Sequence, residues 1–85
     1  MKHEGGIGEM VEHITEAYRG RARRSGWNGK DTFLYYCPGV NSEDGFVMLR
    51  TAAGSYIPWS CSQADLLAED WEMFIGHQDA PREKP

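Results

Sequence analysis

Turn-forming residues divide the middle of this chain into three short runs that are rich in aromatic and other strand-favouring residues. Pro38 with Gly39 closes the first run, and Ala53 with Gly54 separates the second run from the third. Short runs between such turns predict β-strands, and the short connections predict antiparallel pairing. Pro58 has no amide N–H to donate and should lie at an edge or a strand end. The predicted strands cover residues 32–37, 46–51 and 55–59.

An amphipathic helix is predicted before these strands. From Ile7 to Tyr18, apolar residues recur at the offsets of one helical stripe, and three glutamates fall on the other side. Gly20, with arginines on both sides of it, is typical of a helix stop. The helix should therefore end near Arg19.

A second, shorter helix and a last strand are predicted after the three strands. Ser62 followed by Asp65 matches a capping box in form, with Asp in place of Glu or Gln, and apolar residues follow. Apolar residues alternate with others over residues 71–75, which favours a strand. From residue 76 onward we expect a polar tail.

These elements predict the α+β class, with an N-terminal amphipathic helix packed on a small antiparallel β-sheet and one short second helix. The 85 residues form one domain, 1–85, with a core of about residues 7–75 and a polar tail over 76–85. A domain this small buries only roughly 60% of the surface of its unfolded chain, so self-association would add stability. We therefore expect a homo-oligomer.

The two cysteines, Cys37 and Cys61, do not form a metal-ligand motif with each other or with a histidine. We expect no metal and no cofactor. The sequence opens without an apolar signal segment, so we expect reduced thiols and a cytoplasmic protein. No apolar run approaches the roughly 20 residues that cross a bilayer, which predicts that no membrane is involved.

The net charge of −4 hides a basic segment over residues 19–30, which holds four arginines and one lysine and no acid. A negative chain is repelled by a nucleic acid polymer, whereas one basic patch can hold a compact anion such as a pyrophosphate. The alternative is that the arginines form the solvated end of the first helix, where cations complement the helix dipole.

The sequence contains no familiar catalytic motif, neither a nucleophile elbow nor a phosphate-binding loop. Glu69 and Asp70 are adjacent, so their side chains should point in different directions and are poorly placed to share a proton. The three histidines are expected on the surface. We therefore expect a binding protein and not an enzyme.

Two tryptophans lie where a ligand site can form. Trp27 sits in a glycine-containing turn beside basic residues, which suits stacking on an anionic aromatic ligand; the alternative is a lid over the core. Trp59 lies just before the Ser62 helix start, whose free N–H groups favour an anion. Asp65 can accept from a ribose hydroxyl or a base amine, unless it serves only the helix cap. Trp71 has apolar neighbours and is expected in the core.

The order of motifs around these residues resembles a known family. Residues 24–30 read Arg-Ser-Gly-Trp-Asn-Gly-Lys, residues 56–59 read Tyr-Ile-Pro-Trp, and residues 62–71 read Ser-Gln-Ala-Asp-Leu-Leu-Ala-Glu-Asp-Trp. With an aromatic strand after the first block, this order resembles the second Thoeris anti-defence type of phage and prophage proteins, the Tad2-like domain. The resemblance covers about residues 7–75, and its last block is the most specific.

This resemblance implies a non-enzymatic sponge that binds a cyclic nucleotide immune messenger and keeps it from its effector. The messenger would be a cyclic ADP-ribose isomer, and some relatives also take cyclic dinucleotides. The assembly would be a homotetramer, a dimer of dimers.

The resemblance also implies roles for single residues. Trp27 and Trp59 would stack on bases, Arg24 would contact a phosphate, and Asp65 would make a polar contact. Ile7 stands where family members often have a Phe that reaches in from a neighbouring subunit, so that aromatic contact is missing here. The other predicted ligand-binding residues are Asn28, Gly29 and Lys30 in the polar turn, and Ser62 at the helix start.

Two other hypotheses stay open at the level of sequence. Exposed tryptophans also suit a protein-interaction or virion-associated module. A nucleotide hydrolase or lyase would consume the messenger, whereas a sponge would return it intact.

Overall fold

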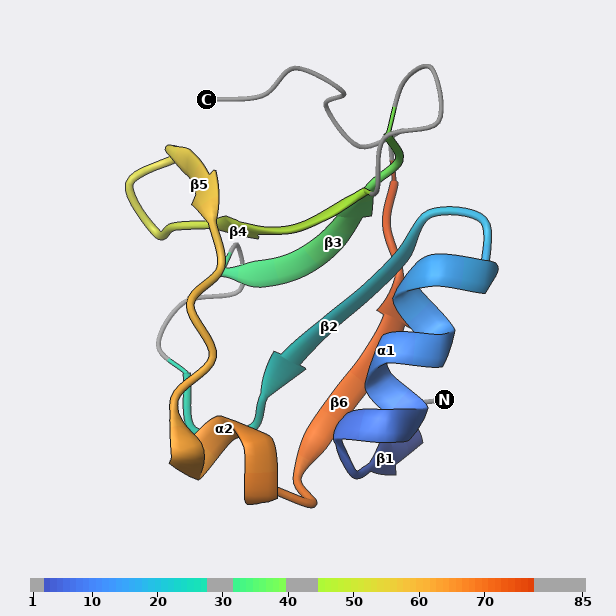
Figure 1. Cartoon of the computed structure of the whole chain (residues 1–85), viewed down its shortest axis with the longest axis vertical. Helices are drawn as coiled ribbons and strands as arrows, with labels where there is room; N and C mark the ends of the chain where they lie inside the picture. Colours follow the sequence, from blue (N-terminus) through green and yellow to red (C-terminus); the bar gives the residue numbers. More distant parts are fainter. Residues whose placement is uncertain (1–2, 28–31, 40–44, 78–85) are drawn as a thin grey trace.

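The computed structural model, which describes residues 3–27, 32–39 and 45–77, shows one six-stranded antiparallel sheet and two helices in that part of the chain (Figure 1). The sheet order is β1-β6-β2-β3-β4-β5. The predicted α+β class and antiparallel sheet are confirmed. The strands are β1 His3–Gly5, β2 Gly20–Arg24, β3 Phe33–Cys37, β4 Phe46–Arg50, β5 Tyr56–Pro58 and β6 Trp71–Ile75, and the helices are α1 Ile7–Glu16 and α2 Gln63–Leu67.

Strands β3, β4 and β5 form the predicted meander, and β5 is an edge of the sheet. The amide of Trp59 donates to the carbonyl of Val47 at 3.0 Å, and Ile57 lies opposite Leu49. Pro58 lies on the edge strand, as predicted, and has no N–H to offer to a further strand. The edge is therefore poorly suited to pairing with another chain.

The arginine-rich segment after α1 was predicted incorrectly. The helix ends at Glu16, earlier than expected near Arg19, and residues 20–24 form strand β2. The alternative that the arginines form a solvated helix end is therefore wrong. Strand β2 pairs with β3 on one side and β6 on the other, and this pairing overrides the weak strand propensity of the segment. The short strand β1, which pairs with β6, was also not predicted.

The chain reverses between α1 and β2 in a tight turn. Arg19 adopts a left-handed backbone conformation with φ of 59°, which costs energy for a residue with a side chain. A Cβ atom on Gly20 would overlap the carbonyl oxygen of His13 and lie 3.1 Å from the Cα of Ile14. Gly20 is therefore required because β2 passes directly against the helix backbone.

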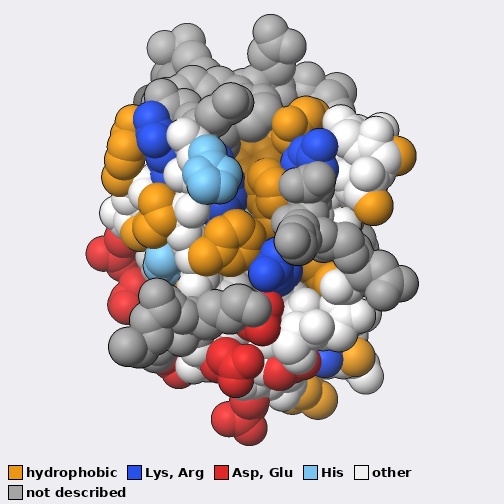
Figure 2. All heavy atoms as spheres, turned by 180° about the vertical axis from the view of Figure 1, so that it is seen from behind, with side chains coloured by type: hydrophobic (Ala, Val, Ile, Leu, Met, Phe, Trp, Pro, Cys, Tyr) orange, Lys and Arg blue, Asp and Glu red, His pale blue; other side chains and the backbone are white. Residues whose placement is uncertain are grey.

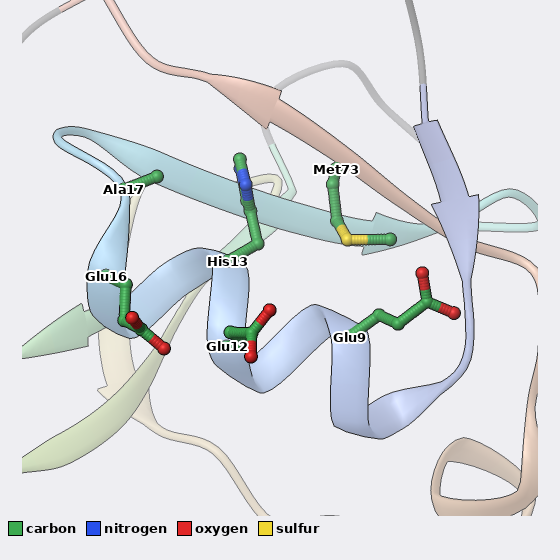
Figure 3. A pocket seen from close by; sticks show the side chains of 6 residues that line it. All are labelled: Glu9, Glu12, His13, Glu16, Ala17 and Met73. Atoms are coloured by element: carbon green, nitrogen blue, oxygen red, sulfur yellow. The ribbon is translucent and has the colours of Figure 1, made fainter.

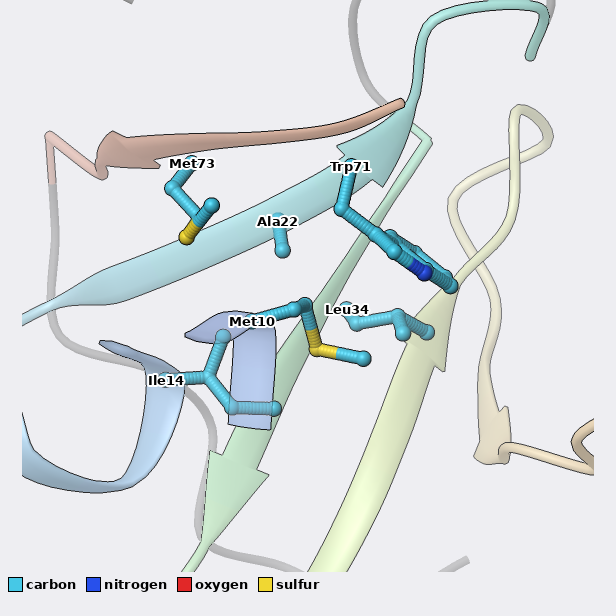
Figure 4. Packing of buried hydrophobic residues seen from close by; sticks show 6 residues of the cluster. All are labelled: Met10, Ile14, Ala22, Leu34, Trp71 and Met73. Atoms are coloured by element: carbon cyan, nitrogen blue, oxygen red, sulfur yellow. The ribbon is translucent and has the colours of Figure 1, made fainter. Parts of the chain in front are cut away.

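The main core lies between α1 and the sheet (Figure 4). Ala22 of β2 lies opposite both Leu34 and Met73, so a small side chain occupies the centre of this sheet face. Met10 and Ile14 of α1 pack over it. The core residues, each at most 4% exposed, are Met10, Ile14, Ala22, Leu34, Trp71 and Met73.

The opposite face of the sheet carries a second buried cluster of Tyr35, Cys37 and Met48, with Phe33 beside it. The guanidinium carbon of buried Arg21 lies 5.3 Å from the ring centre of Phe33 and 5.7 Å from that of Tyr35. Burial raises the pKa of the Tyr35 hydroxyl, which has no hydrogen-bond partner within the described residues. The view from behind shows hydrophobic and basic side chains next to one another (Figure 2).

Three smaller predictions concern the remaining features of the chain. The described residues include no helix that is long and apolar enough to cross a membrane. Cys37 is buried, Cys61 is exposed, and within the described residues neither thiol is part of a disulfide. At the start of the predicted tail, the amide of Gly76 donates to the carbonyl of Arg19 at 2.8 Å, and residues 78–85 lie outside the described part.

A Gly20→Ala substitution should destabilise the fold by about 1–3 kcal/mol, because backbone atoms of α1 leave no room for a methyl group. Chemical denaturation monitored by circular dichroism measures this loss. Gly8→Ala is the matched control, since a Cβ at Gly8 in α1 meets nothing within 4 Å and should stabilise the helix by roughly 0.5–1 kcal/mol. Equal stability of the Gly20 variant and the wild type would contradict the close approach.

Candidate functional site

Trp71 lies at the centre of the site. It is the first residue of β6, its side chain is fully buried, and its indole Nε1 donates to the carbonyl oxygen of Asp65 at 3.1 Å. Trp27 packs edge-on against it with ring centres 5.5 Å apart, and Trp59 does the same at 5.8 Å. These distances and the near-perpendicular planes are the favourable edge-to-face geometry of aromatic pairs. The core position predicted for Trp71 is confirmed.

Trp27 and Trp59 reach Trp71 from different parts of the chain. Trp27 follows the turn after β2, and its amide donates to the carbonyl of Arg24 at 3.0 Å. Trp59 follows β5, the edge strand of the sheet. Both side chains are only half-buried, so each has one surface packed on the core and another facing outward. This arrangement fits both the stacking role and the lid role considered for Trp27.

A hollow of about 350 Å³ adjoins Trp27. Its other lining residues are Gly26, Thr32 and Leu49. Its volume is near the lower end of the range of about 300–1,000 Å³ for small-molecule sites. Trp27 therefore borders an open space to which Leu49 of β4 adds an apolar side chain.

Arg24 is held between two carboxylates. Its Nε donates to Asp70 Oδ1 at 2.6 Å, and its Nη1 donates to Asp65 Oδ1 at 2.9 Å. The hydroxyl of Ser25 donates to the second oxygen of Asp70 at 2.8 Å. The bond from Arg24, followed by that from Ser25, lowers the pKa of Asp70, and the bonds to Asp70 and then Asp65 raise the pKa of Arg24. With one cation and two anions, the trio carries a net charge of −1.

Ser62 caps helix α2 as predicted, because its hydroxyl accepts the amide N–H of Asp65 at 3.1 Å. This amide is one of the donors that a bound anion would use. Among the described residues, the carboxylate of Asp65 accepts from Arg24 and does not close a capping box. Asp65 therefore connects the start of α2, through its backbone and side chain, to Trp71 and Arg24.

Other predicted site residues fall in different places. Ile7 begins α1, is half-buried and packs against the main core. The polar-turn residues Asn28, Gly29 and Lys30 lie outside the described residues. The structure thus brings together Arg24 and Asp65 by a direct bond, and Trp27 and Trp59 through Trp71.

A second hollow, of about 400 Å³, lies along α1 (Figure 3). Glu9, Glu12 and Glu16 project from the helix around it and would repel a phosphate. His13 also lines it, and its Nε2 is 2.8 Å from the carbonyl oxygen of Phe74, so this nitrogen is the donor. His13 is half-buried, which corrects its predicted surface position. This hollow is larger than the one at Trp27 but unsuited to an anionic nucleotide.

Sequence reasoning did not identify Asp70 as part of the site. In the sequence Asp70 stands out only as the neighbour of Glu69, whereas in the structure it bonds to Arg24 at the end of β2 and to Ser25 in the turn that follows. In the sheet register Arg24 lies opposite Trp71, which places the residue before Trp71 next to the Arg24 side chain. The contact could be found only by recognising β2 as a partner of β6, and the arginine-rich segment did not indicate a strand.

Asp70 should stabilise the fold at neutral pH and lose this effect in acid. Because its pKa is lower when folded than when unfolded, its contribution is complete above the unfolded value, about 3.9, and disappears as pH falls through the folded value. Thermal melts should therefore show Asp70→Asn below the wild type at pH 7 and a narrowed gap near pH 3. The control is Glu69→Gln, an exposed neighbour. If Asp70→Asn is as stable as the wild type at pH 7, Asp70 does not stabilise the fold in this way.

Comparison with known proteins identifies the family. Residues 5–74 match the Tad2-like family, described as the Thoeris anti-defense 2-like domain. The chain is also similar to Thoeris anti-defense 2 of Bacillus phage SP01. The two are 32% identical over an alignment 89 residues long, gaps included, which covers 86% of this chain and 98% of the relative. The matched region includes the three tryptophans and the Arg24 contacts. The chain therefore belongs to the Thoeris anti-defense 2-like family.

Proposed function

We propose that this protein binds a cyclic nucleotide immune messenger and sequesters it without cleaving it. Family membership supports a role in phage anti-defence. The observation that carries the finer proposal is the pair of half-buried rings, Trp27 and Trp59, which are both held edge-on by buried Trp71, with an open hollow beside Trp27. Indole faces fixed in this way stack on nucleobases with little loss of side-chain entropy.

The affinity that a sponge needs supports a site shared between subunits. Nanomolar binding corresponds to about −12 kcal/mol, and each stacked base contributes roughly 1–3 kcal/mol. The remainder must come from polar contacts that are shielded from water. The hollow beside Trp27 is lined by Gly26, Trp27 and Thr32 from loops and by Leu49 of β4, and it is too open to enclose a whole nucleotide by itself. We propose that a homotetramer, arranged as a dimer of dimers, completes it.

Roles for the polar residues follow from their positions. Asp65 accepts from Arg24 through one oxygen and, in our proposal, accepts a ribose hydroxyl or base amine through the other. Asn28, Gly29 and Lys30, which follow Trp27 in the sequence, would supply polar and basic contacts. Ser62 would hold the start of α2 in place through its bond to the Asp65 amide. Ile7 would give an aliphatic contact in place of an aromatic one.

The proposal that the messenger is retained intact is supported by the chemistry of the site. Both carboxylates accept charge-assisted hydrogen bonds from Arg24, and the pKa of Asp70 is lowered, which makes it a weaker base. The indole rings supply no nucleophile. Within the described residues, the groups around the hollow are thus suited to binding.

A protein-interaction module is the alternative function, and one observation favours it. Leu66 and Leu67 of α2 are 51% and 77% exposed, so this short helix presents apolar side chains beside the tryptophan site. A single stoichiometric protein partner in a pull-down, without a bound nucleotide, would support this alternative over sequestration.

Replacing Trp27 with Leu should weaken messenger binding by roughly ten- to a hundred-fold, because Leu still covers Trp71 but offers no aromatic face. Calorimetric titration with a cyclic ADP-ribose isomer, and then with a cyclic dinucleotide, measures the change. The titration uses the size-exclusion peak whose mass light scattering has determined, and we expect that of a tetramer.

Tyr18→Leu is the matched control, since Tyr18 is an aromatic residue that is 71% exposed in the turn after α1, away from the three tryptophans. It should bind like the wild type. Unchanged affinity of the Trp27 variant for every messenger that the wild type binds would disprove the stacking role.

A further inference from the structure

We propose that Asp70 is a positioning residue of the ligand site, which holds Arg24 so that Arg24 fixes the turn carrying Trp27 and does not contact the ligand phosphate. This inference rests on the proposed function, in which Trp27 is a stacking surface. It assigns a role to a residue outside the predicted site and gives Arg24 a different role from the one that the family resemblance implies.

Three hydrogen bonds join Asp70 to the end of β2 and to the turn before Trp27. One carboxylate oxygen accepts from Arg24 Nε at 2.6 Å, and the other accepts from the Ser25 hydroxyl at 2.8 Å. The backbone carbonyl of Asp70 accepts the Ser25 amide at 3.2 Å. The amide of Trp27 in turn donates to the Arg24 carbonyl at 3.0 Å. Asp70 therefore holds Arg24 and Ser25, and Arg24 in turn holds the backbone of Trp27.

The same residue also adjoins the other side of the tryptophan contact. Asp70 immediately precedes Trp71, whose ring packs against Trp27 at 5.5 Å. The hydrogen bonds among Asp70, Arg24 and Ser25 form a clamp. This clamp and the Trp27–Trp71 contact join the same two segments, the end of β2 with its following turn and the start of β6. Loosening the clamp should change the angle and separation of the two rings without removing either ring.

The charges of Asp65 and Asp70 beside Arg24 argue against a phosphate contact by Arg24. Its guanidinium faces Asp70 through Nε and Asp65 through Nη1, and only about a quarter of its side chain is exposed. A phosphate that approached it would meet two carboxylates within bonding distance of the same cation. Like charges at this separation repel, and the net charge of −1 favours ligand groups that donate hydrogen bonds. The clamp should therefore face a hydroxyl or an amine of the messenger.

The two roles of Arg24 make opposite predictions for Asp70→Asn. If Arg24 contacts a phosphate, removing a competing carboxylate frees its charge, and the messenger binds as tightly as before or more tightly. If Asp70 positions the turn, Asp70→Asn weakens binding by about ten-fold. In that case Arg24→Gln weakens binding to a similar extent. The double variant should bind the messenger no more weakly than the single variant with the lower affinity, because both changes break the same clamp.

The experiment combines calorimetric titration of a cyclic ADP-ribose isomer with near-ultraviolet circular dichroism of the ligand-free protein. Asp70→Asn should change the tryptophan signal that arises from the Trp27–Trp71 contact while far-ultraviolet dichroism shows an intact fold. Ser25→Ala, which removes only one bond to Asp70, is a milder variant with a smaller change in the same direction. Glu69→Gln is the matched control and should alter neither measurement.

Two results would overturn the inference: tighter or unchanged binding by Asp70→Asn, or a tryptophan signal in that variant identical to that of the wild type. A wild-type protein that binds no messenger would instead overturn the proposed function and the ligand role of Asp70 with it. The near-ultraviolet signal of the free protein would then still report whether Asp70 positions Trp27, so the two failures are distinguishable.

Discussion

The site depends on the burial of one indole ring. Trp71 fills the space between α1, α2 and the sheet, and its N–H is satisfied by the backbone carbonyl of Asp65. A buried tryptophan whose N–H is hydrogen-bonded contributes a large buried apolar area and leaves no buried donor without a partner. Because Trp27 and Trp59 both pack edge-on against this ring, the core that stabilises the domain also sets the orientation of the two aromatic surfaces that face outward. Under the proposed function, stability and ligand recognition therefore depend on the same aromatic contacts.

Electrostatics add a second constraint on the same region. The basic segment looked like an anion site in the sequence, yet its described arginines are used within the chain. Arg24 lies between Asp65 and Asp70, Arg23 Nε donates to Glu72 at 3.1 Å across the β2–β6 pair, and Arg21 is buried over aromatic rings. Partly buried pairs of this kind order the side chains that form them. A messenger would therefore meet a preorganised surface of indole faces and carboxylate edges, and its phosphates would have to find cations elsewhere.

Much of the fold was predictable because local signals agreed with the final pairing. The meander, helix α1, the Ser62 cap and β6 each had their own pattern of turns, periodicity or capping. Strand β2 had none, because it is defined by the two strands that flank it and by Gly20, which lets it pass against the helix. The site was predictable only in part for the same reason. Trp27 stood out as an aromatic residue in a glycine-containing turn and Trp59 as one at a strand end, whereas the Asp70 contact joins segments that only the sheet brings together.

The most direct test of the central claim is to incubate the protein with a cyclic ADP-ribose isomer, recover the complex by size exclusion, denature it with heat and identify the released molecule by chromatography and mass. The account predicts that the messenger co-elutes with the protein in a fixed stoichiometry and is released chemically unchanged. A messenger that fails to co-elute, or that is released as a linear or hydrolysed product, would contradict it.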